Sequence, residues 1–396
     1  MANYNPETYC SYPFTGYDNR TKWTCCIQTG EYNSFTEKAQ SQEILQLQQD
    51  MLNGVKNPVC NVCWMQDQTG ILSARSTTIF LKDPTEIEQE IVNKKLKYLW
   101  IDSGNVCNLS CRMCGPEFSS ALHKESIARN EVDVKFKMRG QYGWGLESRI
   151  KKTNIETLMQ EDYSEIKEIK IMGGEPFLNL DHLKVLNHIV DGGYSANCTL
   201  QYTSNCMVKI PDAILAILPK FNNVLLNFSI DAVGDRASYI RTGSNWDRIN
   251  KNLNYVRELQ ASLPDWKLQV RFSVTTTVLN ILYMDELFDW IKQQVLADRR
   301  WQPDHPEQFS RFYNIFPLNS PDYYSLNVLT DSQRDTVIKK LQQSKYDFSG
   351  LITNTQAARF NPESRELLMD ELKWMQAHHN MAVEQYLPEL VELLGQ

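Results

Sequence analysis

The sequence predicts an α/β fold, namely a partial (β/α)6 barrel of the TIM type with a cysteine-rich module before it and a helical appendage after it. From about residue 96 onward, short β-rich runs alternate with longer segments whose apolar residues recur every three or four positions. This alternation is typical of parallel strands joined by crossover helices. A cysteine triplet and a glycine-rich turn follow two of the β-rich runs, where barrels of this type bind ligands. We expect three parts, residues 1–92, 93–320 and 321–396.

Each expected strand is a run rich in β-branched and aromatic side chains. The strands are Lys97–Asp102, Glu168–Met172, Cys198–Ser204, Val224–Asp231, Leu268–Val278 and Phe312–Phe316. Helical patterns lie between them, at Leu180–Val190, Ala213–Leu218, Asn245–Leu259 and Met284–Val295. Residues Ser364–Leu394 also have apolar positions at helical spacing, so we expect them to form the helical appendage.

Composition and charge indicate an ordinary globular protein. Hydrophobic residues make up 42% of the 396 residues and charged residues 22%, as in ordinary globular proteins. The formal net charge of -7 disfavours nucleic-acid binding, which needs a basic surface. The first residues lack the pattern of a signal peptide and no apolar run is long enough to span a membrane, so we expect a cytoplasmic protein without a membrane partner. Ten cysteines in that setting favour metal or redox chemistry over disulfides.

The strongest chemical signal is the run Cys107-Asn-Leu-Ser-Cys111-Arg-Met-Cys114, directly after the first expected strand. Three thiolates on one short loop can hold three irons of a 4Fe-4S cluster and leave the fourth iron open to an outside ligand. Structural zinc is the alternative. It normally takes four protein ligands, and the nearest candidate for a fourth, His123, lies beyond the loop.

A second signal is the stretch Gly173, Gly174, Glu175 and Pro176, at the end of the second expected strand. The carboxyl ends of parallel strands are where such folds gather their ligand-binding groups. Glycines let the backbone approach a ligand closely, and Glu175 can accept a hydrogen bond from an ammonium group. A plain turn is the alternative interpretation of this stretch alone.

The cysteine triplet and the Gly-Gly-Glu-Pro stretch together resemble the radical S-adenosylmethionine (SAM) superfamily. The resemblance implies that SAM chelates the open iron and that one electron from the reduced cluster cuts it, giving a 5'-deoxyadenosyl radical. The radical would abstract hydrogen from a substrate, either a peptide or protein or a small metabolite. A reductant such as flavodoxin or ferredoxin is implied as a partner, and Gly173 to Pro176 would bind the amino group of SAM.

The resemblance extends to further positions that would bind SAM. They are Met113, Ser204, Asn205, Ser229, Asp231, Arg241 and Asn280. Ser204 and Asn205 close the third expected strand, and Ser229 and Asp231 close the fourth. Arg241 would meet the SAM carboxylate or the substrate, with a surface or capping role as the alternative. Asn280 would face the adenine unless it is only a turn residue, and Met113 stands where many members have an aromatic side chain and would pack on the adenine through its thioether.

Five cysteines precede the barrel, at Cys10, Cys25, Cys26, Cys60 and Cys63. The Cys60-Asn-Val-Cys63 spacing suits zinc and iron-sulfur clusters alike. This segment resembles the twitch or SPASM-type auxiliary-cluster module, here placed ahead of the barrel. That resemblance implies a second 4Fe-4S cluster held by Cys10, by one of Cys25 and Cys26, and by Cys60 and Cys63, with structural zinc as the alternative.

A different class of function is also open, namely a non-catalytic metal-binding or electron-transfer protein. The glycine-rich turn and the polar strand ends argue against it, because an electron carrier needs neither. Two further cysteines, Cys198 and Cys206, flank an apolar strand, and we expect both to be small buried hydrophobes.

Overall fold

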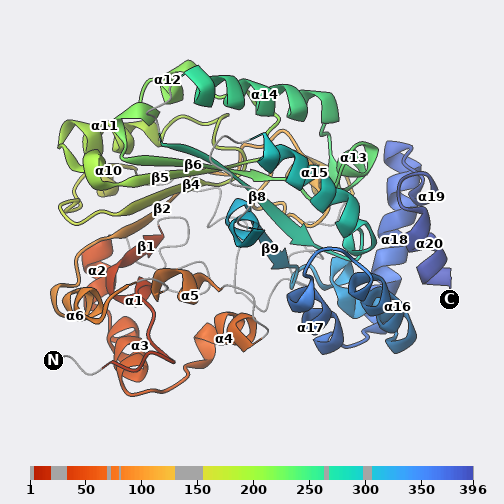
Figure 1. The fold of residues 1–396 in the computed structure, drawn as a ribbon, viewed down its shortest axis with the longest axis horizontal. Coiled ribbons are helices and arrows are strands. Elements are labelled where there is room, and N and C mark those ends of the chain that lie inside the picture. The colour runs from red at the N-terminus through yellow and green to blue at the C-terminus, as the bar shows by residue number, and fades with distance from the viewer. Residues whose placement is uncertain are drawn as a thin grey trace.

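The computed structural model describes residues 4–18, 34–68, 73–79, 82–129, 155–262, 267–297 and 306–395. Within these ranges the centre of the protein is a seven-stranded parallel sheet of order β1-β2-β4-β5-β6-β8-β9, curled into a half-barrel (Figure 1). Its strands are β1 (Gly16–Asp18), β2 (Tyr98–Asp102), β4 (Glu168–Met172), β5 (Thr199–Ser204), β6 (Asn223–Ser229), β8 (Leu268–Thr276) and β9 (Tyr313–Pro317).

Helices that follow the strands cover the outer face of the sheet (Figure 1). They are α10 (Ile155–Leu158), α11 (Leu183–Asp191), α12 (Asp212–Leu215), α13 (Asp235–Ile240), α14 (Trp246–Ser262) and α15 (Met284–Leu296). Strand β4 shows why the layers form, because Ile169 and Ile171 are fully buried in the main core while Lys170 between them is only half-buried. Successive strand residues point to opposite faces, so the apolar set faces the helices and the polar set faces the inside of the half-barrel.

The α/β fold class and all six expected strands are confirmed, with boundaries that differ by one or two residues. Within the described residues, the central sheet has one strand more than the expected (β/α)6 barrel. Strand β1 pairs in parallel with β2, with Gly16 beside Tyr98 and Asp18 beside Trp100. A strand of three residues is too short to show a period in the sequence, which explains why it was not predicted.

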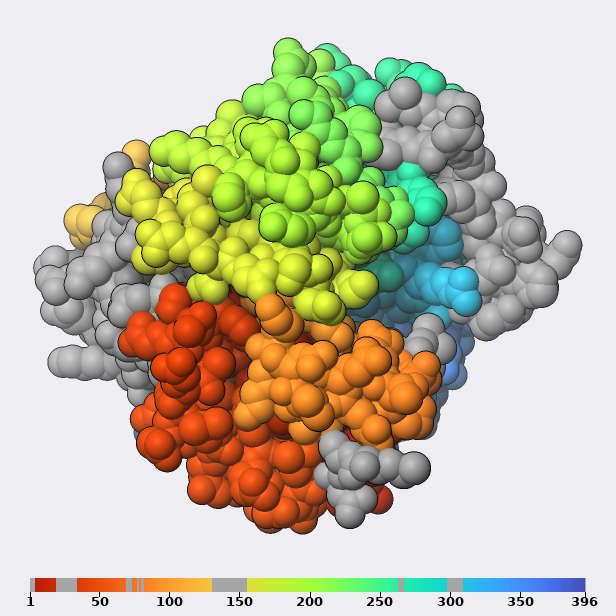
Figure 2. All heavy atoms as spheres, turned by 90° about the vertical axis from the view of Figure 1, so that its left-hand side faces the viewer, coloured from red at the N-terminus to blue at the C-terminus, as the bar shows by residue number. Residues whose placement is uncertain are grey.

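In the described residues before β2 there are six short α-helices. They are α1 (Tyr12–Thr15), α2 (Phe35–Gln40), α3 (Gln42–Leu52), α4 (Asn61–Gln68), α5 (Ala74–Ile79) and α6 (Pro84–Asn93). Tyr9, Tyr12 and Met51 of this N-terminal module form a second core with Trp100 of β2. Figure 2 shows the module in red and orange, in contact with the yellow and green segments above it.

The helices after β9 are α16 (Asp331–Gln342), α17 (Ser349–Ala357), α18 (Pro362–His379), α19 (Val383–Tyr386) and α20 (Pro388–Gly395). The predicted helical appendage is confirmed, and Ser364–Leu394 is divided among α18, α19 and α20. Asn380 adopts a left-handed conformation with φ of 53° and ends α18, and Pro388 opens α20. None of the described helices is both long and apolar enough to cross a membrane.

Candidate active site

The three-cysteine loop lies at the carboxyl end of β2 and is fastened to the segment that follows β6. Its strand β3 (Ser110–Cys111) pairs antiparallel with β7 (Arg241–Thr242), so that Cys111 lies opposite Arg241. A turn closed by Cys114 N–H donating to the Cys111 carbonyl at 3.0 Å brings the third cysteine back toward the second. Cys111 is buried, whereas Cys107 and Cys114 are half-buried. The loop therefore has a fixed place beside the strand ends.

The Gly-Gly-Glu-Pro turn packs directly on this loop. Gly174 N–H donates to the carbonyl of Gly104 at 2.6 Å, and Glu175 N–H donates to the carbonyl of Val106 at 2.8 Å. A Cβ atom at Gly174 would lie 2.4 Å from the Val106 carbonyl oxygen, closer than atoms can pack. Gly173 has a φ of +132°, and a Cβ there would lie 2.6 Å from a carboxylate oxygen of Asp102. The glycines are required because the turn and the loop touch backbone to backbone.

Glu175 joins the ends of β4 and β5 through its carboxylate, which is fully buried. Oε2 accepts from Ser204 Oγ at 3.1 Å and from Asn205 N–H at 2.8 Å, and Oε1 accepts from Phe177 N–H at 3.2 Å. Burial raises the pKa of Glu175 to about 7, although these hydrogen bonds lower it. A carboxylate has about four acceptor positions, and these hydrogen bonds use three of them.

Asn205 connects this carboxylate to the cysteine loop. Its Nδ2 donates to Asn108 Oδ1 at 2.9 Å and lies 3.9 Å from Cys107 Sγ. The structure therefore brings Glu175, Ser204 and Asn205 together at one point beside the three-cysteine loop, as the sequence predicted for the strand ends.

Arg241 and Asp231 form a buried ion pair on the other side of the loop. Arg241 Nε lies 2.6 Å from Asp231 Oδ2, and Arg241 Nη1 lies 3.7 Å from Cys111 Sγ. The second carboxylate oxygen of Asp231 accepts from Thr275 N–H at 2.7 Å. Burial alone would lower the pKa of Arg241, but Asp231 and Cys111 outweigh it and hold that pKa above its ordinary value. The guanidinium is therefore charged where it meets the loop.

The other expected SAM-binding positions take different places. Asn280 is buried, its Nδ2 donates to the carbonyls of Asp231 and Thr275, and its Oδ1 accepts from Thr277 N–H, so it braces the turn after β8. Ser229 is the half-buried last residue of β6, and Met113 packs in the main core. The contacts of these three residues with SAM remain predictions.

Sequence reasoning missed Arg112, which lies between two cysteines of the loop. Its guanidinium pairs with both carboxylate oxygens of Glu125 on α7 (Ser120–Ala128), at 2.8 and 2.9 Å, and lies 5.9 Å from the centre of the Trp374 ring. Arg129 stacks on the same ring at 4.0 Å and pairs with Glu371 at 2.6 and 3.2 Å. A charged residue inside the cysteine motif was the available signal for this network.

The loop fits an iron-sulfur cluster by the chemistry of its donors. Burial raises the pKa of the Cys111 thiol to about 11 and also raises that of Cys107. Buried thiols of this kind ionise when a metal compensates the charge, and Arg241 supplies a further positive charge. In the described ranges, no three His, Cys, Asp or Glu side chains are gathered tightly enough to hold a single metal ion.

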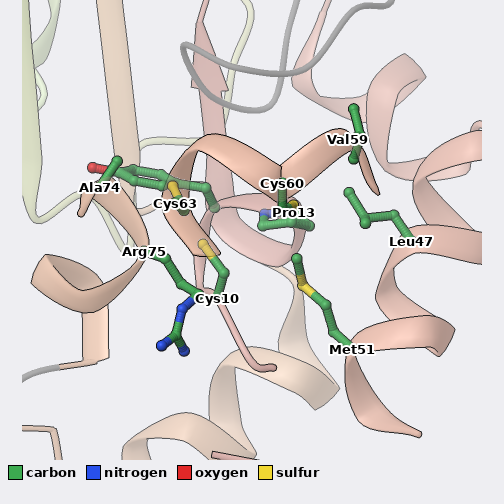
Figure 3. Close-up of a pocket in the computed structure, with 10 residues that line it drawn as sticks. Cys10, Pro13, Leu47, Met51, Val59, Cys60, Cys63, Ala74 and Arg75 are labelled. Atoms are coloured by element: carbon green, nitrogen blue, oxygen red, sulfur yellow. The ribbon is translucent and has the colours of Figure 1, made fainter. Parts of the chain in front are cut away.

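Three of the five expected N-terminal ligands lie in the described part of the chain. Cys10 comes from the residues before α1, Cys60 from the 3-10 turn Pro58–Cys60, and Cys63 from α4, and all three line one pocket (Figure 3). Leu47, Met51 and Val59 form the apolar side of that pocket. Three of the five predicted thiols thus line one pocket, while Cys25 and Cys26 lie outside the described residues. Cys198 and Cys206 are fully buried, as predicted.

A sequence model of the radical SAM superfamily matches residues 101–287. GTP 3',8-cyclase from Psychromonas ingrahamii is 24% identical over 256 residues, which covers 63% of this chain and 66% of that protein. The chain therefore spans just under two thirds of the length of this curated relative.

Two solved structures have a similar arrangement over part of their length. Native anSMEcpe with bound AdoMet and Cp18Cys peptide is 14% identical with a TM-score of 0.37, covering 61% of this chain and 58% of that chain. SuiB from Streptococcus suis bound to S-adenosylmethionine is 16% identical with a TM-score of 0.32, covering 73% and 68%. The stretch that the family model matches contains the three-cysteine loop, the Gly-Gly-Glu-Pro turn and Arg241, so this part of the chain is similar to the radical SAM superfamily.

Proposed function

We propose that this protein is a radical SAM enzyme in which Cys107, Cys111 and Cys114 hold an open-site 4Fe-4S cluster. When bound, the cluster and SAM supply a 5'-deoxyadenosyl radical that takes hydrogen from the substrate. The observation that carries the proposal is the backbone contact between Gly174, Glu175 and the cysteine loop. This contact supports one site in which metal ligands and the SAM-binding turn have a fixed relation.

The side chains around the loop have separate tasks in this proposal. Glu175 accepts a hydrogen bond from the SAM ammonium through its remaining acceptor position, while Ser204 and Asn205 hold its carboxylate in place. A preorganised acceptor loses little entropy when the ligand binds. The expected contacts of Met113, Ser229 and Asn280 belong to the same proposed SAM site.

We further propose a second 4Fe-4S cluster on Cys10, Cys60, Cys63 and one of Cys25 and Cys26. The pocket that the three described thiols share supports it. Zinc at this site is the competing assignment, and iron analysis separates the two, since two clusters require about eight irons per chain. A flavodoxin or ferredoxin as reductant, a cytoplasmic setting, and a peptide, protein or small metabolite as substrate complete the proposal.

The test is the Cys111→Ala variant of the full chain, assayed with SAM and a strong chemical reductant. We expect release of 5'-deoxyadenosine to be abolished, because the cluster loses one of its three ligands. Cys198→Ala is the matched control, since this thiol is buried in the core and takes no part in the site. Release at the parent rate from Cys111→Ala would show that the loop does not hold the SAM cluster.

A further inference from the structure

The place of the Arg241 side chain follows from the pairing of two short strands. In the β3–β7 pair Cys111 lies directly opposite Arg241, and Arg112 N–H donates to the Ile240 carbonyl at 2.9 Å. Side chains that lie opposite each other in an antiparallel pair project from the same face, with Cβ atoms about 4.5–5.5 Å apart. The backbone therefore keeps the Arg241 side chain next to the Cys111 sulfur.

Asp231 holds the guanidinium group of Arg241 in place. Its carboxylate is fully buried, accepts from Thr275 N–H at 2.7 Å and meets Arg241 Nε at 2.6 Å. Asn280 donates to the backbone carbonyl of the same aspartate at 3.0 Å. If the guanidinium swung away, it would leave a buried carboxylate without its counter-charge, which is strongly unfavourable. Arg241 Nη1 thus stays 3.7 Å from Cys111 Sγ.

A hydrogen-bond donor and a positive charge beside a ligand sulfur act on the redox state of a cluster. The reduced cluster carries one more negative charge than the oxidised cluster, so both stabilise the reduced form and raise the reduction potential. A nearby carboxylate acts in the opposite direction. Arg241 and Asp231 therefore affect the cluster with opposite signs although they form one ion pair.

We infer that Arg241 is a positioning residue that raises the reduction potential of the cluster on Cys107, Cys111 and Cys114, and that Asp231 limits this rise. The inference rests on the proposed function, because it needs the cluster at this loop. It gives Arg241 a role in the absence of SAM, unlike the contact with the SAM carboxylate that the sequence resemblance implied. The structure carries it through the Arg241–Cys111 contact and the anchored Asp231 carboxylate.

The experiment compares the reconstituted parent with Arg241→Gln, Arg241→Lys and Asp231→Asn in the absence of SAM. At one fixed applied potential, electron paramagnetic resonance gives the ratio of reduced to oxidised cluster, using the signal whose shape changes when SAM is later added. We expect Arg241→Gln to lower this ratio about tenfold or more, which equals about 59 mV for a one-electron couple. Asp231→Asn should raise the ratio, and Arg241→Lys should fall between the parent and Arg241→Gln.

Arg236→Gln is the matched control, because Arg236 lies on α13, the helix directly before β7, and pairs with Glu286 at 3.0 Å. Its ratio should equal that of the parent. A general disturbance of the site would move both members of the ion pair in the same direction, so opposite shifts identify the electrostatic effect.

The outcomes separate the inference from the proposed function. A parent protein without any iron-sulfur signal that responds to SAM contradicts the proposed function, and the inference fails with it. A parent that responds to SAM, with an unchanged ratio in Arg241→Gln, overturns the inference alone, and so does weakened SAM binding without a change in potential. If Arg241→Gln does not retain its cluster, Asp231→Asn decides, because a ratio that stays level or falls overturns the inference.

Discussion

Glu175 is a carboxylate with its oxygens partly used by the protein and a pKa raised to about 7 by burial. The ionised form accepts a charge-assisted hydrogen bond from an ammonium group, which is stronger than the hydrogen bond that the protonated acid accepts. As the pH falls below about 7, protonation of Glu175 weakens this interaction, so we expect SAM affinity in the parent to be lower at pH 6 than at pH 8. An equilibrium titration of SAM at the two pH values measures this.

The Glu175→Gln variant tests the same interaction by removing the charge. A hydrogen bond to a charged group contributes about 1.5–3 kcal/mol, so SAM affinity should fall about tenfold or more and its dependence on pH should disappear. The iron content should stay the same because no cluster ligand changes. Glu168→Gln, at the first residue of β4 and paired with Lys170, is the control. An equal pH dependence in Glu175→Gln and the parent would mean that Glu175 does not contact the SAM ammonium.

Gly174 tests the contact between the turn and the cysteine loop. In Gly174→Ala the added Cβ would meet the Val106 carbonyl at 2.4 Å, and backbone on both sides leaves little freedom to relax. We expect a loss of about 1–3 kcal/mol in the free energy of unfolding and poorer iron retention, because the loop must move. Chemical denaturation and iron analysis after gel filtration measure the two effects.

Gly193→Ala separates backbone strain from overlap. Gly193 has a φ of +77° with no atom within 4 Å of an added Cβ, so alanine there costs about 1–2 kcal/mol of strain without any clash. Its iron content should match that of the parent. Equal iron retention in the two alanine variants would show that the loop does not depend on the turn.

At the scale of elements, helix α18 holds the cysteine loop through a buried network of charges. Arg112 and Glu125 form one pair, Arg129 and Glu371 form the other, and Trp374 lies beside both arginines. Charges this deep are stable only when paired. The helices after the barrel are therefore in direct contact with the site, because this network ends between two cysteines of the loop.

We expect Glu371→Gln to destabilise the protein by about 3 kcal/mol, because the buried Arg129 guanidinium loses the nearer of the two carboxylates it faces, Glu371 at 2.6 Å, and keeps Glu125 at 4.0 Å. Iron retention should also fall, since the network reaches the cysteine loop. Asp370→Asn is the matched control, an acid-to-amide change one residue earlier on α18 at an exposed pair with Lys373. Chemical denaturation of both variants gives the comparison, and equal free energies of unfolding would contradict a supporting role for the network.

At the scale of the whole molecule, six of the eight described thiols lie at two places, three on the loop after β2 and three lining the pocket of the N-terminal module. In the double variant Cys60→Ala, Cys63→Ala we expect roughly half the iron to be lost, because one of two four-iron clusters is removed. Cleavage of SAM by a strong chemical reductant should continue, whereas conversion of the substrate should fail. Iron, 5'-deoxyadenosine and a circular dichroism melt are measured on one preparation.

The melt decides whether the double variant is informative about metal binding. A folded protein that keeps all its iron would show that Cys60 and Cys63 are not cluster ligands. A folded protein that loses half its iron and still cleaves SAM would support two independent clusters.

By itself, the sequence determined the fold class and the residue pattern on which the proposed site rests. Strands β2, β4, β5, β6, β8 and β9 each contain enough β-branched and apolar residues to be recognised, and the cysteine spacing and the Gly-Gly-Glu-Pro stretch are local patterns. Local patterns depend on neighbouring residues alone, so they can be recognised in the sequence before the packing is known. The burial of Cys198 and Cys206 followed from the same local argument.

Only the tertiary structure decided which residues meet. The three residues of β1 joined the sheet because β2 offered an open edge, and the register of β3 with β7 placed Arg241 against Cys111. Trp374 lies on α18, far along the chain from Arg112, and its ring centre is 5.9 Å from the Arg112 guanidinium. An apolar period in a sequence indicates that a face is buried but not which partner buries it. The contacts that shape this site are between distant segments, and packing geometry rather than local propensity fixes them.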